Sequence, residues 1–359
     1  MLHNSQKDFL KRHIGPSEED KSKMLKKLNY KSLDDLIDNT VPEKIQFKGE
    51  LNIGESNSEY EALRKLKTIS KKNQIYSNFI GMGYYGTYTP YVILRNILEN
   101  PGWYTSYTPY QPEVAQGRLE MLLNFQQLII DLTGMDIANA SLLDEATAAA
   151  EAVGLSQRLD KNDSKKIFVS SSCNPQTIDL IKTRTEPFGL ELIIGNEKED
   201  LTNISENIIC GVLAYPGTLG DIQDPSESIS QIHKKNGKAI LICDLLALTR
   251  LKTPAELGAD IAVGSAQRFG IPMGYGGPHA AFFATKEEFK RSMPGRIIGV
   301  SVDRHGKKAY RLSLQTREQH IRRDKATSNI CTAQALLAII SAAFAIYHGP
   351  KGILKIANR

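Results

Sequence analysis

The sequence is poor in cysteine and lacks a long uninterrupted apolar run. Its four cysteines, Cys173, Cys210, Cys243 and Cys331, are widely spaced and form no Cys-x-x-Cys pair, which argues against a disulfide framework and a cysteine-based zinc site. Three of them lie in or beside apolar, strand-like segments, where buried free thiols in a reducing compartment are the ordinary state. No apolar run reaches the length of a membrane span.

A targeting segment and a one-signed charge are also missing. Residues 1–8 have neither an apolar signal core nor an Arg-rich, acid-poor transit composition, so we expect a cytoplasmic bacterial protein. The 45 basic and 40 acidic residues are interspersed and leave a formal net charge of only +5, which is unlike the basic stripe of a nucleic-acid binder. His320 has no second His or Cys at metal-ligand spacing, so no metal site is expected.

Length and composition are those of a soluble globular chain. Of its 359 residues, 41% are hydrophobic and 24% are charged, which is ordinary for a protein that buries a core. Residues 1–77 predict polar helices with too few apolar positions for a core of their own, so we expect a helical arm that packs on something else. A large α/β domain is expected over residues 78–332, followed by the start of a truncated C-terminal small domain over residues 333–359.

Short Val- and Ile-rich runs alternate with helical patterns in the middle of the chain. Six runs have strand character: residues 166–170, 190–194, 211–215, 239–243, 261–264 and 280–284. Helical patterns lie between several of them, notably at residues 175–183 and 226–235. Strands joined by helical crossovers predict a mostly parallel sheet that is covered on both faces.

The segment 79–113 is rich in glycine and tyrosine. Within it, Gly81, Gly83 and Gly86 match the G-x-G-x-x-G pattern of dinucleotide-binding sites. That pattern requires a strand before it and a helix directly after it, whereas the residues before it make a poor buried strand and residues 87–90 interrupt any helix. Two interpretations remain open: a Gly-rich turn that displays aromatic side chains, or a binding loop whose tyrosine hydroxyls and glycine backbone hold a small carboxylate.

A candidate anion site precedes the Ala-rich helical segment that follows residue 144. Thr147 lies in the first turn of this segment, whose N–H groups are suited to a phosphate. Asp144 and Glu145 oppose that interpretation, because their negative charges repel a phosphate. Ordinary helix capping by Asp144 accounts for the same pattern.

Asp244 ends one of the apolar strand-like runs, and open α/β sheets bind ligands at the carboxyl ends of their strands. In pyridoxal-phosphate (PLP) enzymes an aspartate at this place pairs with the ring nitrogen of the cofactor; an aspartate that caps a turn is the alternative. In fold-type-I PLP enzymes the lysine that bears the cofactor comes just past the strand that follows this aspartate. In this sequence no lysine occurs between Lys252 and Lys286. The missing lysine argues against a free-standing PLP enzyme.

Longer motifs carry a family resemblance. They are RHIGP (12–16), FIGMGYYGTYTP (79–90), WYTSYTPYQPE (103–113), LLDEATAAAE (142–151), GSAQRFG (264–270) and QTREQHIRRDKATSNICT (315–332). Each resembles the P-protein of the glycine cleavage system, and together they span the chain nearly end to end.

The resemblance implies the fold-type-I architecture of PLP-dependent transferases, which is aspartate-aminotransferase-like, built from two homologous halves that are fused or separate. This chain is similar to the N-terminal half, and the C-terminal half or partner subunit carries the PLP-bearing lysine. Gln267 stands where that lysine would be. Residues 303–308 are similar to the fused version, and the apolar pattern near the end of the chain also suits a fragment of a fused protein.

The activity implied is that of a glycine dehydrogenase (aminomethyl-transferring, decarboxylating). PLP decarboxylates glycine at a site shared by the two halves, and the lipoyl arm of the H-protein accepts the aminomethyl group. The intact enzyme is expected to be a dimer, and this chain alone is expected to be inactive. A catalytically silent half that supports dimerisation and docks the H-protein is the alternative.

The resemblance also suggests residue roles, although no catalytic residue is assigned to this half. Tyr84 and Tyr85 are expected to reach into the shared site and bind the glycine carboxylate, with Tyr107, Gln111 and Glu113 on the same wall. Aromatic packing between the two halves is the alternative for each tyrosine. Thr147, Asp244 and Gln267 mark the degenerate positions of a cofactor site.

Overall fold

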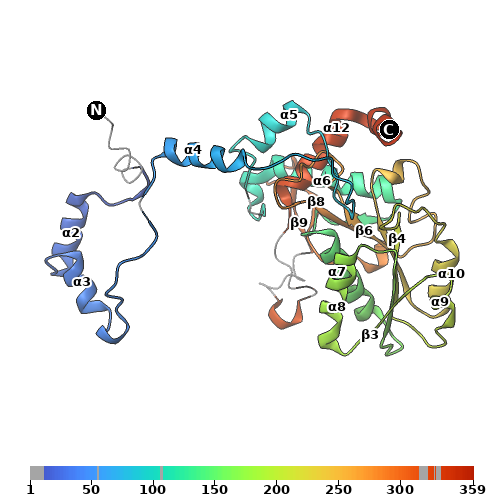
Figure 1. The fold of residues 1–359 in the computed structure, drawn as a ribbon. Helices are drawn as coiled ribbons and strands as arrows, with labels where there is room; N and C mark the ends of the chain where they lie inside the picture. The colour runs from blue at the N-terminus through green and yellow to red at the C-terminus, as the bar shows by residue number, and fades with distance from the viewer. Residues whose placement is uncertain (1–11, 55, 106–107, 315–321, 327, 329–332) are drawn as a thin grey trace. The chain divides into compact units, whose positions relative to one another are not determined.

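The computed structural model describes residues 12–54, 56–105, 108–314, 322–326, 328 and 333–359. Tyr107, His320 and Cys331, which figured in the sequence predictions, lie outside the described residues. The chain forms two compact units, Met1–Ser77 and Asn78–Arg359 (Figure 1).

The first unit is helical. Its elements are α2 (Glu18–Leu28), α3 (Leu33–Thr40), the 3₁₀ turn η1 (Glu43–Ile45) and α4 (Glu59–Ser70). Ser17 and Ser58 start α2 and α4 with capping boxes, in which the serine hydroxyl accepts from the N3 backbone and the N3 carboxylate accepts from the serine N–H. No residue of these helices is buried. What covers their apolar side chains stays a prediction.

The second unit is built on a seven-stranded sheet. Its strands are β1 (Ile137–Ala138), β2 (Lys166–Ser170), β3 (Glu191–Gly195), β4 (Cys210–Tyr215), β5 (Lys238–Cys243), β6 (Ile261–Ser265) and β7 (Ala281–Thr285). Their order across the sheet is β1-β7-β6-β5-β4-β2-β3. Strands β2 to β6 are mutually parallel, whereas β7 runs antiparallel to β6 and to β1. The expectation of a mostly parallel sheet is confirmed.

Helices cover both faces of this sheet. They are α6 (Pro112–Thr133), α7 (Glu145–Leu159), α8 (Pro175–Thr185), α9 (Asp200–Asn203), α10 (Ser226–Lys234) and α12 (Ala335–Ala357). In β5, Ile240 and Ile242 join a buried cluster with α7 and α8, while Leu241 and Cys243 join the cluster with α6, α10 and α12. Strand side chains alternate between faces, so continuous apolar runs such as β5 fill two cores at once.

Helix boundaries follow local signals with one exception. Gly134 ends α6 in the left-handed conformation, with φ 69°, where glycine carries no Cβ penalty. The α-helix after Pro90 is short, because α5 (Tyr91–Ile93) continues as a π-helical turn, η2 (Leu94–Leu98). Shorter 3₁₀ turns are η3 (Glu186–Phe188), η4 (Ala247–Thr249), η5 (Glu287–Phe289) and η7 (Arg323–Lys325).

A β-hairpin, absent from the sequence prediction, lies beside α6. Its strands β8 (Ile297–Val302) and β9 (Lys308–Ser313) pair antiparallel. Gln126 and Gln116 of α6 fasten the hairpin, because each side-chain amide bonds both the N–H and the C=O of one strand residue. The hairpin therefore depends on α6 as much as on its own alternation of apolar and polar residues.

Within the described part of the chain, α12 alone is long and apolar enough by composition to cross a membrane. Its Ala338, Ile339, Ile340 and Phe344 are buried in the core cluster that also holds α6, as expected of a core helix. The helix bends at Gly349, which has φ 62° and precedes Pro350. The assignment of residues 333–359 to a separate small domain stays a prediction.

Candidate active-site pocket

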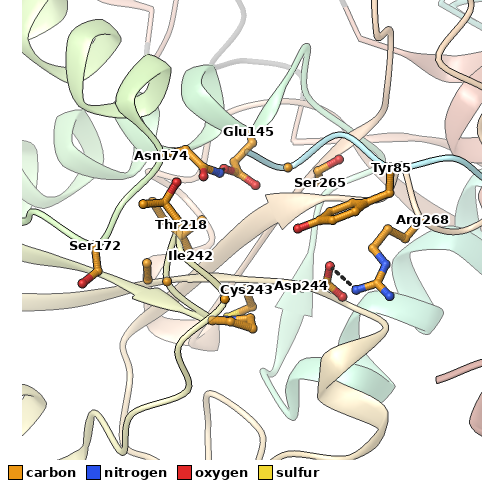
Figure 2. Close-up of a pocket in the computed structure, with 15 residues that line it drawn as sticks. Tyr85, Glu145, Ser172, Asn174, Thr218, Ile242, Cys243, Asp244, Ser265 and Arg268 are labelled. Atoms are coloured by element: carbon orange, nitrogen blue, oxygen red, sulfur yellow. Dashed lines mark hydrogen bonds and ion pairs between the residues drawn. The ribbon is translucent and has the colours of Figure 1, made fainter. Parts of the chain in front are cut away.

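A pocket of about 230 Å³ lies at the carboxyl ends of the parallel strands (Figure 2). Polar residues from four strand ends line it: Ser172 and Asn174 after β2, Thr218 after β4, Asp244 after β5, and Ser265 and Arg268 at the end of β6. Strand β4 lies beside β2 although β3 comes between them in sequence. The order in which successive strands are added to the sheet thus reverses between β2 and β4, and open α/β sheets bind ligands at such a point.

Gln267 lies two residues past the end of β6 and is fully buried, with 0% relative exposure. Its amide oxygen accepts from the Tyr85 N–H at 3.2 Å, and its amide nitrogen donates to the Tyr85 carbonyl at 2.8 Å and to the Ile271 carbonyl at 2.7 Å. The amide therefore has partners for its oxygen and its nitrogen.

Asp244 has two partners in this structure. Its Oδ1 accepts from the Ala247 N–H at 2.9 Å, which caps the turn after β5, and its Oδ2 pairs with Nη1 of Arg268 at 3.0 Å. The Arg268 guanidinium also lies 5.0 Å from the ring centre of Tyr85, a cation–π distance. Figure 2 shows Asp244, Arg268 and Tyr85 grouped at one end of the pocket.

The first turn of α7 is occupied by the protein's own side chains. Asp144 is its N-cap, and its Oδ1 accepts from the Thr147 N–H at 2.7 Å. The Glu145 N–H lies 3.2 Å from Nε2 of His279, whose Nδ1 is 2.9 Å from the Gly277 carbonyl. That geometry fits a neutral imidazole that donates from Nδ1 and accepts at Nε2. Thr147 itself is buried, so helix capping by Asp144 accounts for this turn.

Glu145 places its carboxylate in the lining of the main pocket, against Asn174 and Thr177 of the segment that follows β2. Its Oε1 accepts from Nδ2 of Asn174 at 3.0 Å and lies 3.5 Å from the Thr177 hydroxyl. Loss of water around the carboxyl, together with the charge of Asp244, raises the pKa of Glu145 above its usual value. The pocket is acidic at this end.

Tyr84 and Tyr85 are adjacent but line different cavities. Tyr85 lines the main pocket, whereas Tyr84 lines a neighbouring cavity of about 280 Å³ together with Asp144 and His279. The Tyr84 ring packs edge-on against His279, with centroids 5.8 Å apart. It also covers Gly277, where an added Cβ would lie 2.5 Å from Cε1 of Tyr84. Within the described residues, neither phenol makes a hydrogen bond.

Burial raises the pKa of both phenols, to which the charge of Asp144 adds at Tyr84 and that of Asp244 at Tyr85. Both hydroxyls are therefore protonated at neutral pH and are available as donors.

Gln111 and Glu113, expected on the same wall, are exposed at the start of α6. Neither lines the cavities of the two tyrosines, and no hydrogen bond or ion pair among the described residues joins them to Tyr84 or Tyr85. The structure thus brings Tyr85, Asp244 and Gln267 together. Sequence reasoning missed Asn174, Arg268 and His279, although the first two come four and three residues after strand ends, which was the available signal.

The sheet order and the pocket at the strand ends define the fold-type-I class of PLP-dependent enzymes. A crystal structure of glycine decarboxylase (P-protein) in inhibitor-bound form is similar, with a TM-score of 0.87 and 34% identity, covering 95% of this chain and 78% of that chain. A sphingosine-1-phosphate lyase from Burkholderia pseudomallei shares the fold alone, with a TM-score of 0.58 and 13% identity over 89% of this chain and 75% of that one.

The family model of the glycine cleavage system P-protein matches residues 11–359, and the chain belongs to that family. A glycine dehydrogenase (decarboxylating) from Pelagibacter ubique is 79% identical over 358 residues, which are 100% of this chain and 37% of that protein. Its counterpart from Nostoc sp. is 59% identical over 98% of this chain and 36% of its own length. The chain thus spans little more than a third of the curated relatives it matches.

The pocket does not fit PLP. No lysine is among the described residues that line it, so none can form the covalent bond. The first N–H groups of α7 that would hold a phosphate are taken by Asp144 and His279, and the Glu145 carboxylate would repel one. Arg268 already pairs with Asp244, the carboxylate that a protonated ring nitrogen would need.

Proposed function

We propose that this chain is the N-terminal half of a glycine dehydrogenase (decarboxylating) and that it presents Tyr84 and Tyr85 to a PLP site completed by the C-terminal half. The observation that carries the proposal is the pairing of Gln267 with Tyr85. A buried amide replaces the lysine and holds the tyrosine loop, while the two phenols remain without a hydrogen-bond partner in the described chain. The similarity to relatives named glycine dehydrogenase supports the reaction.

The two halves divide the chemistry in this proposal. PLP, held by a lysine of the C-terminal half, supplies the electron sink for loss of CO2 from glycine. Tyr84 and Tyr85 of this chain donate hydrogen bonds that bind and orient the glycine carboxylate. A phenol that donates to a carboxylate makes a charge-assisted hydrogen bond, which is worth about 1.5–3 kcal/mol.

The remaining parts of the proposal concern partners and location. The lipoyl arm of the H-protein accepts the aminomethyl group, and the intact enzyme acts as a dimer in the cytoplasm. Tyr107, Gln111 and Glu113 are proposed on the same wall of the shared site, in the part that the C-terminal half completes.

A silent half that supports assembly and H-protein docking is the second candidate. It is favoured by the packing of both rings within this half, Tyr84 on His279 and Tyr85 on Arg268. In that case the phenol oxygens are dispensable and the rings alone matter.

Tyr84→Phe and Tyr85→Phe in the intact two-half enzyme separate the two candidates, because each substitution keeps the ring and removes the hydroxyl. We expect kcat/KM for glycine, measured by decarboxylation and CO2 exchange, to fall roughly tenfold to a hundredfold. The two variants should differ in size of effect, because the two rings line different cavities.

Tyr88→Phe is the matched control, since Tyr88 is 95% exposed and lies three residues farther along the same segment. It should retain wild-type kinetics. Thermal unfolding is measured for all three variants. Wild-type kinetics for both Tyr84→Phe and Tyr85→Phe would make the carboxylate role wrong, and losses that only follow stability would favour the silent half.

A further inference from the structure

The segment of residues 81–90, here called the tyrosine loop, is fastened to the turn of residues 267–271 that follows β6. Besides the two hydrogen bonds between Gln267 and Tyr85, the Thr87 hydroxyl donates to the Ile271 carbonyl and the Thr89 hydroxyl to the Gly270 carbonyl, each at 2.7 Å. These contacts join residues about 180 positions apart in sequence. The loop has no regular secondary structure of its own, so its conformation depends on this turn.

Gln267 makes the contact that fixes Tyr85 itself. Its amide pairs with both the N–H and the C=O of Tyr85, as a neighbouring strand would. A lysine at this position cannot accept from the N–H, and a carboxylate cannot donate to the C=O. Asparagine is one methylene too short for the same reach. The next residue, Arg268, lies over the ring of the same tyrosine, so two consecutive residues hold its backbone and its side chain.

We propose that Gln267 is a positioning residue: the position that lost the cofactor lysine now sets the conformation of the tyrosine loop through its amide. This inference rests on the proposed role of Tyr84 and Tyr85 in binding glycine. Without the amide, the Tyr85 N–H and C=O lose their partners in a partly buried site, and the loop samples other conformations. The phenols then spend less time where a carboxylate can meet them.

Gln126 supplies a matched control. It is also buried, with 5% relative exposure, and its amide likewise bonds one backbone residue twice: the Ile298 N–H donates to Oε1 at 2.7 Å, and Nε2 donates to the Ile298 carbonyl at 3.2 Å. It joins α6 to β8 and shares no partner with the tyrosine loop. Loss of this amide therefore tests the same chemistry at a place with no proposed role.

The experiment compares Gln267→Met, Gln267→Glu and Gln126→Met in the intact two-half enzyme with PLP. Methionine keeps the approximate volume and removes the amide, and glutamate keeps an acceptor while losing the donor. Hydrogen–deuterium exchange of peptides that cover residues 82–88 reports the loop directly, glycine kinetics report the site, and thermal unfolding reports overall stability. Gln267→Glu is close in shape to the native residue and remains interpretable if Gln267→Met fails to fold.

For both Gln267 variants we expect exchange in residues 82–88 to become roughly tenfold faster and KM for glycine to rise roughly tenfold, with a smaller change in kcat, since one neutral hydrogen bond corresponds to about that factor. Gln126→Met should lower the melting temperature to a similar extent and leave both loop exchange and KM within about twofold of wild type.

Unchanged loop exchange in both Gln267 variants would overturn the positioning role and leave the proposed function standing. Faster loop exchange with an unchanged KM would instead overturn the proposed binding role of the tyrosines, on which the inference depends. A rise in KM of equal size in Gln126→Met would assign the effect to stability and also overturn the positioning role.

Discussion

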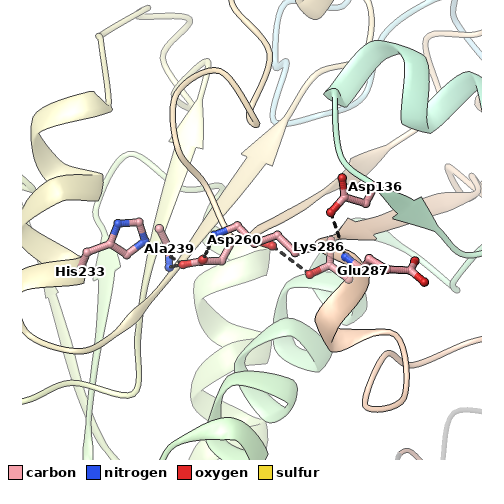
Figure 3. Close-up of polar contacts among 7 residues, drawn as sticks. Asp136, His233, Ala239, Asp260, Lys286 and Glu287 are labelled. Carbon is pink, nitrogen blue, oxygen red and sulfur yellow. Dashed lines mark hydrogen bonds and ion pairs between the residues drawn. The ribbon is translucent and has the colours of Figure 1, made fainter.

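The amino ends and the carboxyl ends of the parallel strands form two opposite edges of the central sheet, here called the amino edge and the carboxyl edge. Each edge carries a carboxyl group away from bulk water, but the two carboxyl groups have opposite electrostatic surroundings. At the amino edge, Asp260 accepts from Nε2 of His233 and the Ala239 N–H, each at 2.8 Å, and pairs with Nζ of Lys286 (Figure 3). At the carboxyl edge, Glu145 meets an amide and a hydroxyl, and no cation among the described residues pairs with it. Asp260 is paired with the Lys286 cation, whereas Glu145 has no cation partner among the described residues.

The pKa of Asp260 and the pKa of Glu145 are shifted in opposite directions. Burial would raise the pKa of Asp260, but hydrogen bonds from Lys286, the Ala239 N–H and His233 outweigh it and hold the pKa below its usual value. At Glu145 burial prevails, and the pKa is raised. A group whose pKa is raised by burial beside a pocket is a functional-site candidate, while structural ion-pair networks also shift pKa values. The comparison therefore assigns stability to the amino edge and makes the carboxyl edge the candidate for ligand binding.

The largest effect is expected from Asp260→Asn, which breaks the amino-edge network. Removing one partner of a buried ion pair leaves the other uncompensated, so the variant should lose about 3 kcal/mol of unfolding free energy near pH 7. Because the pKa of Asp260 is lowered in the folded state, its stabilisation is present above the ordinary carboxyl pKa and is lost as pH falls through the lowered value. Urea unfolding at several pH values measures both.

Asp163→Asn is the control for that substitution, because Asp163 pairs with Lys165 on the surface, where their side chains are 92% and 63% exposed. Surface pairs contribute little, so this variant should unfold like the wild type. If Asp260→Asn is no less stable than this control, the amino edge is not a stabilising network and the contrast between the edges disappears.

A smaller effect of opposite sign is expected from Glu145→Gln. The amide keeps an oxygen that can accept from Asn174 and removes the charge, so the variant should gain about 1 kcal/mol of unfolding free energy near pH 8. Because burial raises the pKa of Glu145, the native carboxyl costs stability only as pH rises above its ordinary pKa and through the raised one.

The pH dependence of the unfolding free energy of Glu145→Gln tests whether the charge of Glu145 is destabilising. At pH values below the ordinary carboxyl pKa, Glu145 is protonated in both folded and unfolded chains, and the gain should vanish. A destabilised Glu145→Gln protein at pH 8 would contradict the description of this carboxylate as an unfavourable charge and would point to an unseen favourable partner.

How much of this was predictable from sequence differs between elements. The parallel strands were predictable because runs such as β5 are apolar on both faces, and apolar runs between helical patterns have few alternative structures. The hairpin β8–β9 was not, because its strands depend on Gln116 and Gln126 of a helix about 190 and 170 positions away. The register of a strand and the residues that it pairs with are properties of the folded chain, and the local sequence pattern does not encode them.

Some features of the pocket were also predictable from the sequence, and others were not. Asp244 and Gln267 were predictable because strand ends and a missing lysine are visible in the sequence. The ion pair of Asp244 with Arg268, and the contact of His279 with the first turn of α7, join residues that are 24 and 134 positions apart. These partners occupy groups that a phosphate or a ring nitrogen would need, and they appear only when the sheet brings the strand ends together.

The smallest effect, no change in the number of PLP molecules bound, is expected from Gln267→Lys, which places an amine at the proposed degenerate position of the carboxyl edge. If a missing amine were the sole defect, the variant would bind a second PLP. The first turn of α7 remains blocked by Asp144 and His279, and Asp244 remains paired with Arg268. The introduced lysine therefore has neither a phosphate site nor an unpaired aspartate beside it. We expect that it will not bind PLP, because most of the cofactor's binding contacts lie away from the carbon that reacts with the lysine.

Borohydride reduction of the intact Gln267→Lys protein with PLP, followed by peptide mass spectrometry, measures this directly. The lysine proposed in the C-terminal half serves as the internal reference, and we expect one adduct per pair of halves, as in the wild type. A stoichiometric adduct on the introduced lysine would show that the pocket still accepts the phosphate despite Asp144 and Glu145. The degenerate site would then differ from an active one by a single side chain, and the blocked turn of α7 would be irrelevant to cofactor binding.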